Sequence, residues 1–137
     1  MNEPRGAGSA ATPTSRILVV DDDAPLRSGI AKTLTRAGYV VVQAANGQEA
    51  IESYRAAPAD LVLTDIYMPG TDGVEAMIRL RAEFPDLLVV AMSGGGHMAK
   101  EGVLDLAARL GARGTLEKPV GRKALLGMIA KVLSPGA

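Results

Sequence analysis

Short apolar runs alternate along the chain with segments whose apolar positions have helical spacing. The apolar runs are about five residues long and rich in Val, Ile and Leu, which is typical of strands buried on both faces. Strands are predicted at Arg16–Val20, Tyr39–Gln43, Asp60–Thr64, Leu87–Met92 and Arg113–Glu117. Between the first two, Leu26, Ile30 and Leu34 recur every four residues and therefore share one helical face. Helices are predicted at Pro25–Ala37, 47–57, Val74–Glu83, Ala99–Leu110 and Arg122–Leu133.

Five successive strand–helix pairs indicate an α/β fold: a single doubly wound parallel sheet of five strands with five helices. Right-handed crossovers place each helix between the two strands that it connects. The pairs occupy residues 16–133, which we expect to form one domain. Residues 1–15 are small, polar and rich in Pro and Gly, so a flexible N-terminal tail is expected there, with residues 134–137 as a C-terminal tail.

Composition narrows the class of protein. A length of 137 residues suits one domain, and 47% hydrophobic residues suffice for a core, which must be aliphatic because only 3% are aromatic. Zero formal net charge argues against a dominant surface for nucleic acid or anionic membranes. The absence of Cys excludes disulfides and thiol chemistry. No apolar run approaches the ~20 residues of a membrane span and no signal pattern is present, so we expect a cytoplasmic protein.

Polar side chains follow most of the predicted strands. Asp21–Asp23 follow the first strand, Asp65 the third, Ser93 the fourth and Lys118 the fifth. The second strand ends at Gln43, which adds little chemistry. Because parallel strands present their carboxyl ends at one edge of a sheet, and sites form there, we expect these side chains to converge.

Several carboxylates in one small pocket repel one another, and a bound divalent cation relieves that repulsion. Oxygen ligands without His or Cys indicate a hard cation such as Mg2+, which also takes a phosphate oxygen as ligand. Ser93 could donate a hydrogen bond to a phosphoryl oxygen, and Lys118 could place a positive charge beside it. Since Asp can serve as a nucleophile that forms an aspartyl phosphate, the set fits phosphoryl transfer onto an aspartate.

With these motifs, the chain resembles the receiver domain of two-component response regulators, including the chemotaxis response regulators. The resemblance extends over about Arg16 to Leu133. The motifs that carry the resemblance are, in chain order, Ile17-Leu18-Val19-Val20-Asp21-Asp22, Leu63-Thr64-Asp65-Ile66-Tyr67-Met68-Pro69-Gly70-Thr71-Asp72-Gly73, Met92-Ser93 and Glu117-Lys118-Pro119. The resemblance implies a flavodoxin-like sheet with strand order 2-1-3-4-5.

The resemblance also implies a role for each acidic residue. Asp65 would be the phosphoacceptor and a metal ligand. Asp22 would bind Mg2+ directly, while Asp21 would reach it largely through water. Tyr67 would supply only its backbone carbonyl to the metal.

By the same resemblance, Ser93 and Lys118 would grip the phosphoryl group, and Pro119 would follow a cis peptide bond. Thr115 departs from the family, which usually has Tyr or Phe at this position. That aromatic ring normally moves inward when the hydroxyl residue closes on the phosphate. Because Thr115 cannot fill the same volume, the usual switch between Ser93 and position 115 is in doubt.

The function implied is a phosphorylation-controlled switch. A histidine kinase, a histidine phosphotransfer protein or a small phosphodonor would phosphorylate Asp65 with Mg2+, and the modified domain would present a changed surface to a downstream effector or output domain. No output domain is visible in the chain, and no direct contact with nucleic acid or membrane is expected. The protein would not be a conventional enzyme, although it would catalyse its own phosphorylation and dephosphorylation.

Two alternatives remain open from the sequence. Asp21–Asp23 loosely match the Asp-x-Asp motif of haloacid-dehalogenase-type phosphohydrolases, but that interpretation leaves Asp65 unexplained. The second alternative is a degenerate receiver that acts only as a protein-binding module. The departure from the family at Thr115 is the feature that favours this alternative. Individual carboxylates also have structural interpretations: Asp23 before Pro25 predicts a helix N-cap, and Asp60 a turn or cap residue.

Overall fold

The computed structural model describes residues 15–66, 73–94, 102, 105 and 108–134. Its core is one parallel sheet with the strand order β2-β1-β3-β4-β5, which confirms the predicted doubly wound topology. The strands are β1 (Arg16–Val20), β2 (Val40–Ala44), β3 (Leu61–Asp65), β4 (Val89–Gly94) and β5 (Gly114–Lys118). Most bounds lie within a residue of the prediction, and β4 begins two residues later than predicted.

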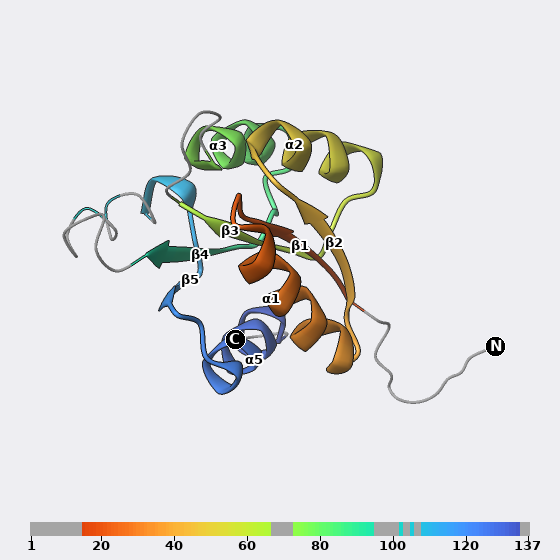
Figure 1. Ribbon diagram of the computed structural model, residues 1–137. Coiled ribbons are helices and arrows are strands. Elements are labelled where there is room, and N and C mark those ends of the chain that lie inside the picture. Colours follow the sequence, from red (N-terminus) through yellow and green to blue (C-terminus); the bar gives the residue numbers. More distant parts are fainter. Residues whose placement is uncertain (1–14, 67–72, 95–101, 103–104, 106–107, 135–137) are drawn as a thin grey trace.

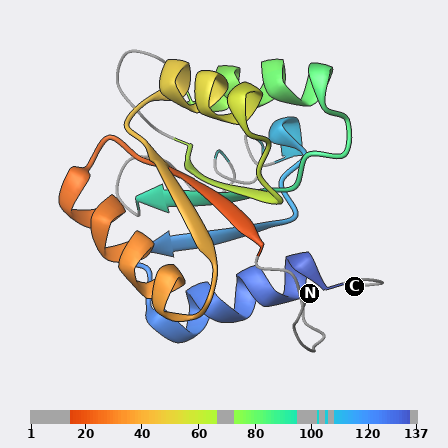
Figure 2. The ribbon, with the colours of Figure 1, turned by 90° about the vertical axis from the view of Figure 1, so that its right-hand side faces the viewer.

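Helices cover both faces of the sheet. They are α1 (Ala24–Arg36), α2 (Gly47–Ala56), α3 (Gly73–Glu83) and α5 (Arg122–Leu133). Residues 108–110 are also helical, and most of the remaining helix predicted at Ala99–Leu110 lies outside the described residues. The pair α2 and α3 lies on one face of the sheet, and α1 and α5 lie on the other (Figure 1). The turned view in Figure 2 shows the same two layers.

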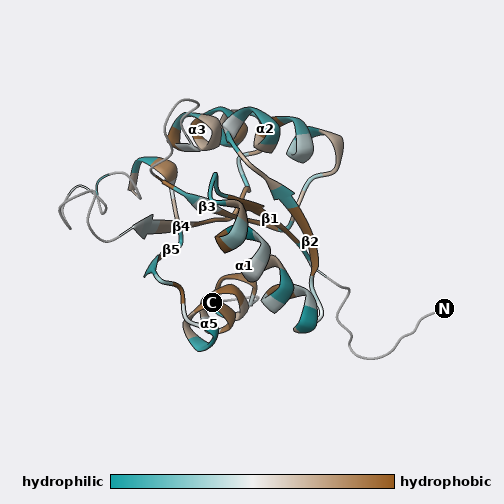
Figure 3. Cartoon of the chain, viewed as in Figure 1, coloured by the Kyte–Doolittle hydropathy of each residue, from teal (hydrophilic) through white to brown (hydrophobic). Residues whose placement is uncertain are grey.

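The alternation of side chains along each strand produces two separate cores. Leu18 and Val20 of β1 pack towards α2 and α3, whereas Ile17 and Val19 pack towards α1 and α5. All four are at most 1% exposed. In Figure 3 the strands at the centre of the sheet are mainly brown, and they lie between two helical layers in which α1, α2 and α3 carry hydrophilic segments.

Two side-chain caps fix where helices begin. Asp23 accepts a hydrogen bond of 3.1 Å from the Leu26 amide, which confirms the predicted N-cap of α1 with proline in the first turn. Asn46 caps α2 by accepting one of 2.9 Å from the Glu49 amide. The cap at Asp23 directs the chain from β1 into α1 immediately after two further aspartates, so it also helps to place Asp21 and Asp22 at the end of β1.

The parallel arrangement brings the carboxyl ends of β1, β3, β4 and β5 to one edge of the sheet, the place where sites form in such folds. Across the described part of the chain, no helix is both long enough and apolar enough to cross a bilayer. The parallel topology makes the carboxyl edge of the sheet the expected position of a functional site.

Candidate functional site

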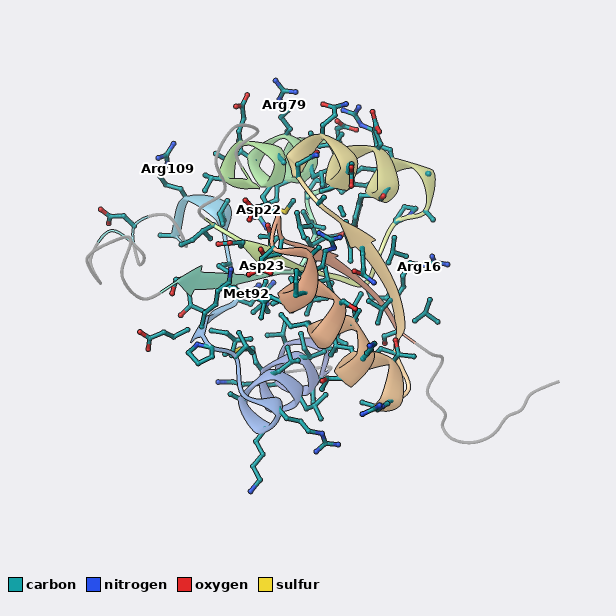
Figure 4. The ribbon with its side chains drawn as sticks, in the orientation of Figure 1. Arg16, Asp22, Asp23, Arg79, Met92 and Arg109 are labelled. Carbon is teal, nitrogen blue, oxygen red and sulfur yellow. The ribbon has the colours of Figure 1, made fainter. Side chains whose placement is uncertain are left out.

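Three carboxylates meet at the carboxyl edge of the sheet. Asp21 and Asp22 follow β1, Asp65 ends β3, and one oxygen from each lies within 4.8 Å of the others. Asp21 and Asp65 are buried, whereas Asp22 is exposed. In Figure 4, Asp22 and Asp23 lie between the two helical layers, near the point where α1 begins. The structure therefore brings together the acidic residues that the sequence singled out.

Lys118 at the end of β5 joins this cluster. Its Nζ lies 2.8 Å from Oδ2 of both Asp21 and Asp65, and it donates a hydrogen bond to Asp65. Burial alone would lower the pKa of Lys118, but the close contacts of its ammonium group with the Asp21 and Asp65 carboxylates, and the negative charges of both, outweigh the effect of burial, so the pKa is raised. The ammonium group therefore stays charged across the physiological range.

Nearly every polar atom of Asp21 has a protein partner. Its amide donates to the Ala44 carbonyl at 3.1 Å, and its own carbonyl accepts from Arg27 at 2.7 Å. Its Oδ1 accepts from the Asp23 amide at 2.9 Å. Its buried Oδ2 lies beside Lys118 but accepts no well-aligned hydrogen bond from any described residue. Asp21 thus has one buried oxygen with remaining capacity to accept a hydrogen bond.

The residues at this edge fit a hard divalent cation. The cluster contains three carboxylates and one ammonium group, which contacts two of them, so it keeps an excess of negative charge. The donors are all oxygen atoms, which suits Mg2+ better than a softer metal. Asp22 offers an exposed carboxylate for a cation, and the buried Oδ2 of Asp21 offers hydrogen-bonding capacity that the described residues leave unused.

Two other predicted site residues, Ser93 and Thr115, lie in strands that end at the same edge of the sheet. Ser93 is half-buried in β4 and follows Met92, the register partner of Asp65. Thr115 is half-buried in β5 opposite Ala91, three residues before Lys118. Tyr67 lies outside the described residues.

The peptide bond between Lys118 and Pro119 is cis, as the resemblance implies. The strand register also places Gly94 opposite Lys118, so β4 and β5 end side by side at the acidic edge.

Two further contributors to the site had no signal in the sequence. Arg27 of α1 donates from Nη1 to the Asp21 carbonyl at 2.7 Å and from Nε to Gln43 Oε1 at 3.0 Å. Gln43 therefore contributes more to this edge than its position in the sequence indicated. The missing information was the register of β1 and β2, which pairs Val19 with Gln43 and so brings Gln43 beside the end of β1.

Comparison with known proteins yields one consistent family. The family model of the response regulator receiver domain matches residues 17–130. The chain is 35% identical over 105 residues to the chemotaxis protein CheY of Thermotoga maritima, covering 76% of this chain and 85% of that protein. It is 38% identical over 121 residues to the chemotaxis protein CheY of Treponema pallidum, covering 86% of this chain and 82% of that protein.

Solved structures agree with the sequence comparison. The crystal structure of the receiver domain of NtrX from Brucella abortus superposes with a TM-score of 0.80 at 29% identity. The match covers 88% of this chain and 99% of that domain. Both the sequence and the fold therefore resemble receiver domains over nearly the whole described chain.

Proposed function

Because the chain belongs to the response regulator receiver domain family, we propose that it accepts a phosphoryl group on Asp65 in a Mg2+-dependent reaction. One observation carries the proposal: Asp21, Asp22 and Asp65 converge from two strands, and Lys118 reaches them from a third. The proposed receiver unit comprises residues 16–133. A histidine kinase or histidine phosphotransfer protein would be the donor, a downstream effector or output domain would read the result, and the cytoplasm would be the location.

In the proposed reaction, the Asp65 carboxylate forms a P–O bond as the P–N bond of a phosphohistidine breaks, and the leaving imidazole takes up a proton. Hydrolysis later returns Asp65 and inorganic phosphate. Asp21, Asp22 and Asp65 would hold Mg2+, together with the backbone carbonyl of Tyr67. When bound, the cation would neutralise charge that builds up on the phosphoryl oxygens.

Lys118 and Ser93 would hold the phosphoryl group. Lys118 already lies 2.8 Å from Asp65, so its ammonium would meet a phosphoryl oxygen with little movement. The Ser93 hydroxyl would donate a hydrogen bond to a second oxygen. Ser93 and Thr115 would form the switch, although the Thr115 side chain is much smaller than the aromatic ring usual at this position.

The experiment is incubation with a small phosphodonor such as acetyl phosphate, with the mass of the intact protein as readout. The wild-type chain is expected to gain one phosphoryl group in the presence of Mg2+ and none with EDTA. Asp65→Asn should gain none, whereas Asp86→Asn, which alters an exposed carboxylate outside the cluster, should behave as wild type.

Two results would point to the alternatives raised by the sequence. A wild-type chain that takes up no phosphoryl group yet binds a partner would be a degenerate binding module. Turnover of a generic phosphate ester that is lost in Asp21→Asn but kept in Asp65→Asn would indicate a phosphohydrolase.

A further inference from the structure

Arg27 links three elements around the acidic edge. It projects from the first turns of α1, its Nε donates to Gln43 near the end of β2, and its Nη1 donates to the Asp21 carbonyl at the end of β1. The guanidinium group is planar and its donors have fixed directions, so two simultaneous hydrogen bonds define its position. Gln43 thus holds the guanidinium group, and the guanidinium group holds the backbone of Asp21.

The Asp21 carbonyl lies in the peptide that joins Asp21 to Asp22. Fixing this peptide therefore limits how the backbone of both proposed metal ligands can rotate. On the other side of the same turn, the Asp23 amide donates to Asp21 Oδ1 at 2.9 Å, so the turn is held from its backbone and from its side chain. The Asp21 amide also donates to the Ala44 carbonyl of β2 at 3.1 Å, so the turn is tied to the edge strand by one backbone hydrogen bond and, through Arg27, by the Gln43 side chain.

Charge alone would give Arg27 the opposite effect on a cation. A positive guanidinium group beside an acidic cluster repels Mg2+, so its removal should strengthen binding on electrostatic grounds. Geometry predicts that its removal weakens binding, because the ligands would have to be ordered when the metal arrives. The two effects have opposite signs and can be separated by experiment.

We propose that Arg27, held by Gln43, is a positioning residue that keeps the turn at residues 21–23 in its metal-binding conformation. The inference rests on the proposed Mg2+ site of Asp21, Asp22 and Asp65. Arg27 is not one of the proposed ligands and acts through the backbone of Asp21.

The test is Mg2+ titration of the full chain by calorimetry, without phosphodonor. Because hydrogen bonds to charged groups are among the stronger ones, Arg27→Ala is expected to weaken Mg2+ binding about fivefold to tenfold. Arg27→Lys keeps the charge but cannot make both hydrogen bonds, so it should show a smaller loss. Unchanged or tighter binding in Arg27→Ala would overturn the proposal, as would unchanged binding in Arg27→Lys.

A double-mutant cycle tests whether Gln43 acts through Arg27. Gln43→Ala should weaken Mg2+ binding in the wild-type background and have no further effect in the Arg27→Ala background. Full additivity would contradict the proposed linkage. Arg79→Ala is the matched control, because Arg79 pairs within α3 with Glu75 at 3.1 Å and lies well away from the labelled Asp22 in Figure 4.

Amide hydrogen exchange at Asp23, measured in EDTA, gives a readout that does not depend on metal. Faster exchange in Arg27→Ala and in Gln43→Ala is expected, and exchange equal to wild type in both would overturn the proposal. If the wild-type chain binds no Mg2+ while Asp23 exchange responds as expected, the proposed metal site fails and the positioning of the turn stands.

Discussion

This domain contains two sets of ion pairs that use the same kinds of charged groups but differ greatly in how far they are buried. At the carboxyl edge, the Lys118 side chain is 18% exposed, and its partners Asp21 and Asp65 are 0% and 6% exposed. On the outer surface, Arg55 of α2 pairs with Glu83 of α3, and their side chains are 53% and 40% exposed. The exposed pair replaces hydration by water with an ionic contact and gains little stability. The buried carboxylates have lost their hydration and depend on the ammonium group of Lys118 to compensate their charge.

This difference indicates that the buried cluster is not there for stability. Its charges do not balance, since three carboxylates, those of Asp21, Asp22 and Asp65, gather beside the ammonium group of Lys118, which contacts two of them. Apolar residues of similar volume would make a more stable core than an incomplete ionic cluster. An arrangement that sacrifices stability at the edge where sites form is typical of a functional site.

Lys118→Met should cause the largest loss of stability. With Mg2+ absent and at neutral pH, two buried carboxylates would face each other without the ammonium group, and unfolding should become easier by about 3 kcal/mol. Chemical denaturation in EDTA measures the change. Arg55→Met is the control at the exposed pair and should scarcely move the transition. Equal losses in the two variants would contradict the distinction between buried and exposed pairs.

Mg2+ should stabilise the folded chain through the acidic cluster and leave the exposed ion pair unaffected. A cation that binds only the folded chain stabilises it by about 2.7 kcal/mol at a hundred times its Kd. Thermal unfolding with and without Mg2+ should show this gain in the wild-type chain and in Asp86→Ala. In Asp22→Ala the gain should be lost, although the exposed Asp22 contributes little to stability in EDTA. A gain that survives in Asp22→Ala would place the cation elsewhere.

The smallest effect is expected from a buried group that carries no charge at neutral pH. Tyr54, next to Arg55 in α2, is 5% exposed, and burial followed by the nearby charge of Asp60 raises its pKa. The unfolded phenol ionises near pH 10, so this part of the stability is present below about pH 10 and is lost as the pH rises through the folded pKa. Alkaline unfolding of wild type and Tyr54→Phe measures it. Identical pH profiles in wild type and Tyr54→Phe would contradict a raised pKa for Tyr54.

Much of the fold could be predicted from the sequence because its signals are local. The apolar runs predicted as strands at Arg16–Val20 and Asp60–Thr64 can be recognised without knowledge of the neighbouring strands, and Asp23 caps α1 through a hydrogen bond to a residue three positions away. The convergence of Asp65 with Lys118 could also be predicted, because strand ends in a parallel sheet share an edge.

The features that could not be predicted depend on strand register and side-chain orientation. Gln43 and Arg27 are 16 residues apart and meet only because β2 pairs with β1 in one particular register. The hydrogen-bonding capacity left at Asp21 Oδ2 is likewise a property of the folded site, since it depends on how Lys118 is aligned. No pattern of residue types along the chain encodes either feature.

The central claim is that this acidic edge makes the carboxylate of Asp65 a phosphoryl acceptor. The most direct measurement is site mapping by mass spectrometry after brief reaction with a phosphodonor and Mg2+. One phosphoryl group is expected, on the peptide that contains Asp65, and none when EDTA replaces Mg2+. A phosphoryl group on another carboxylate, or uptake that does not require Mg2+, would contradict the claim.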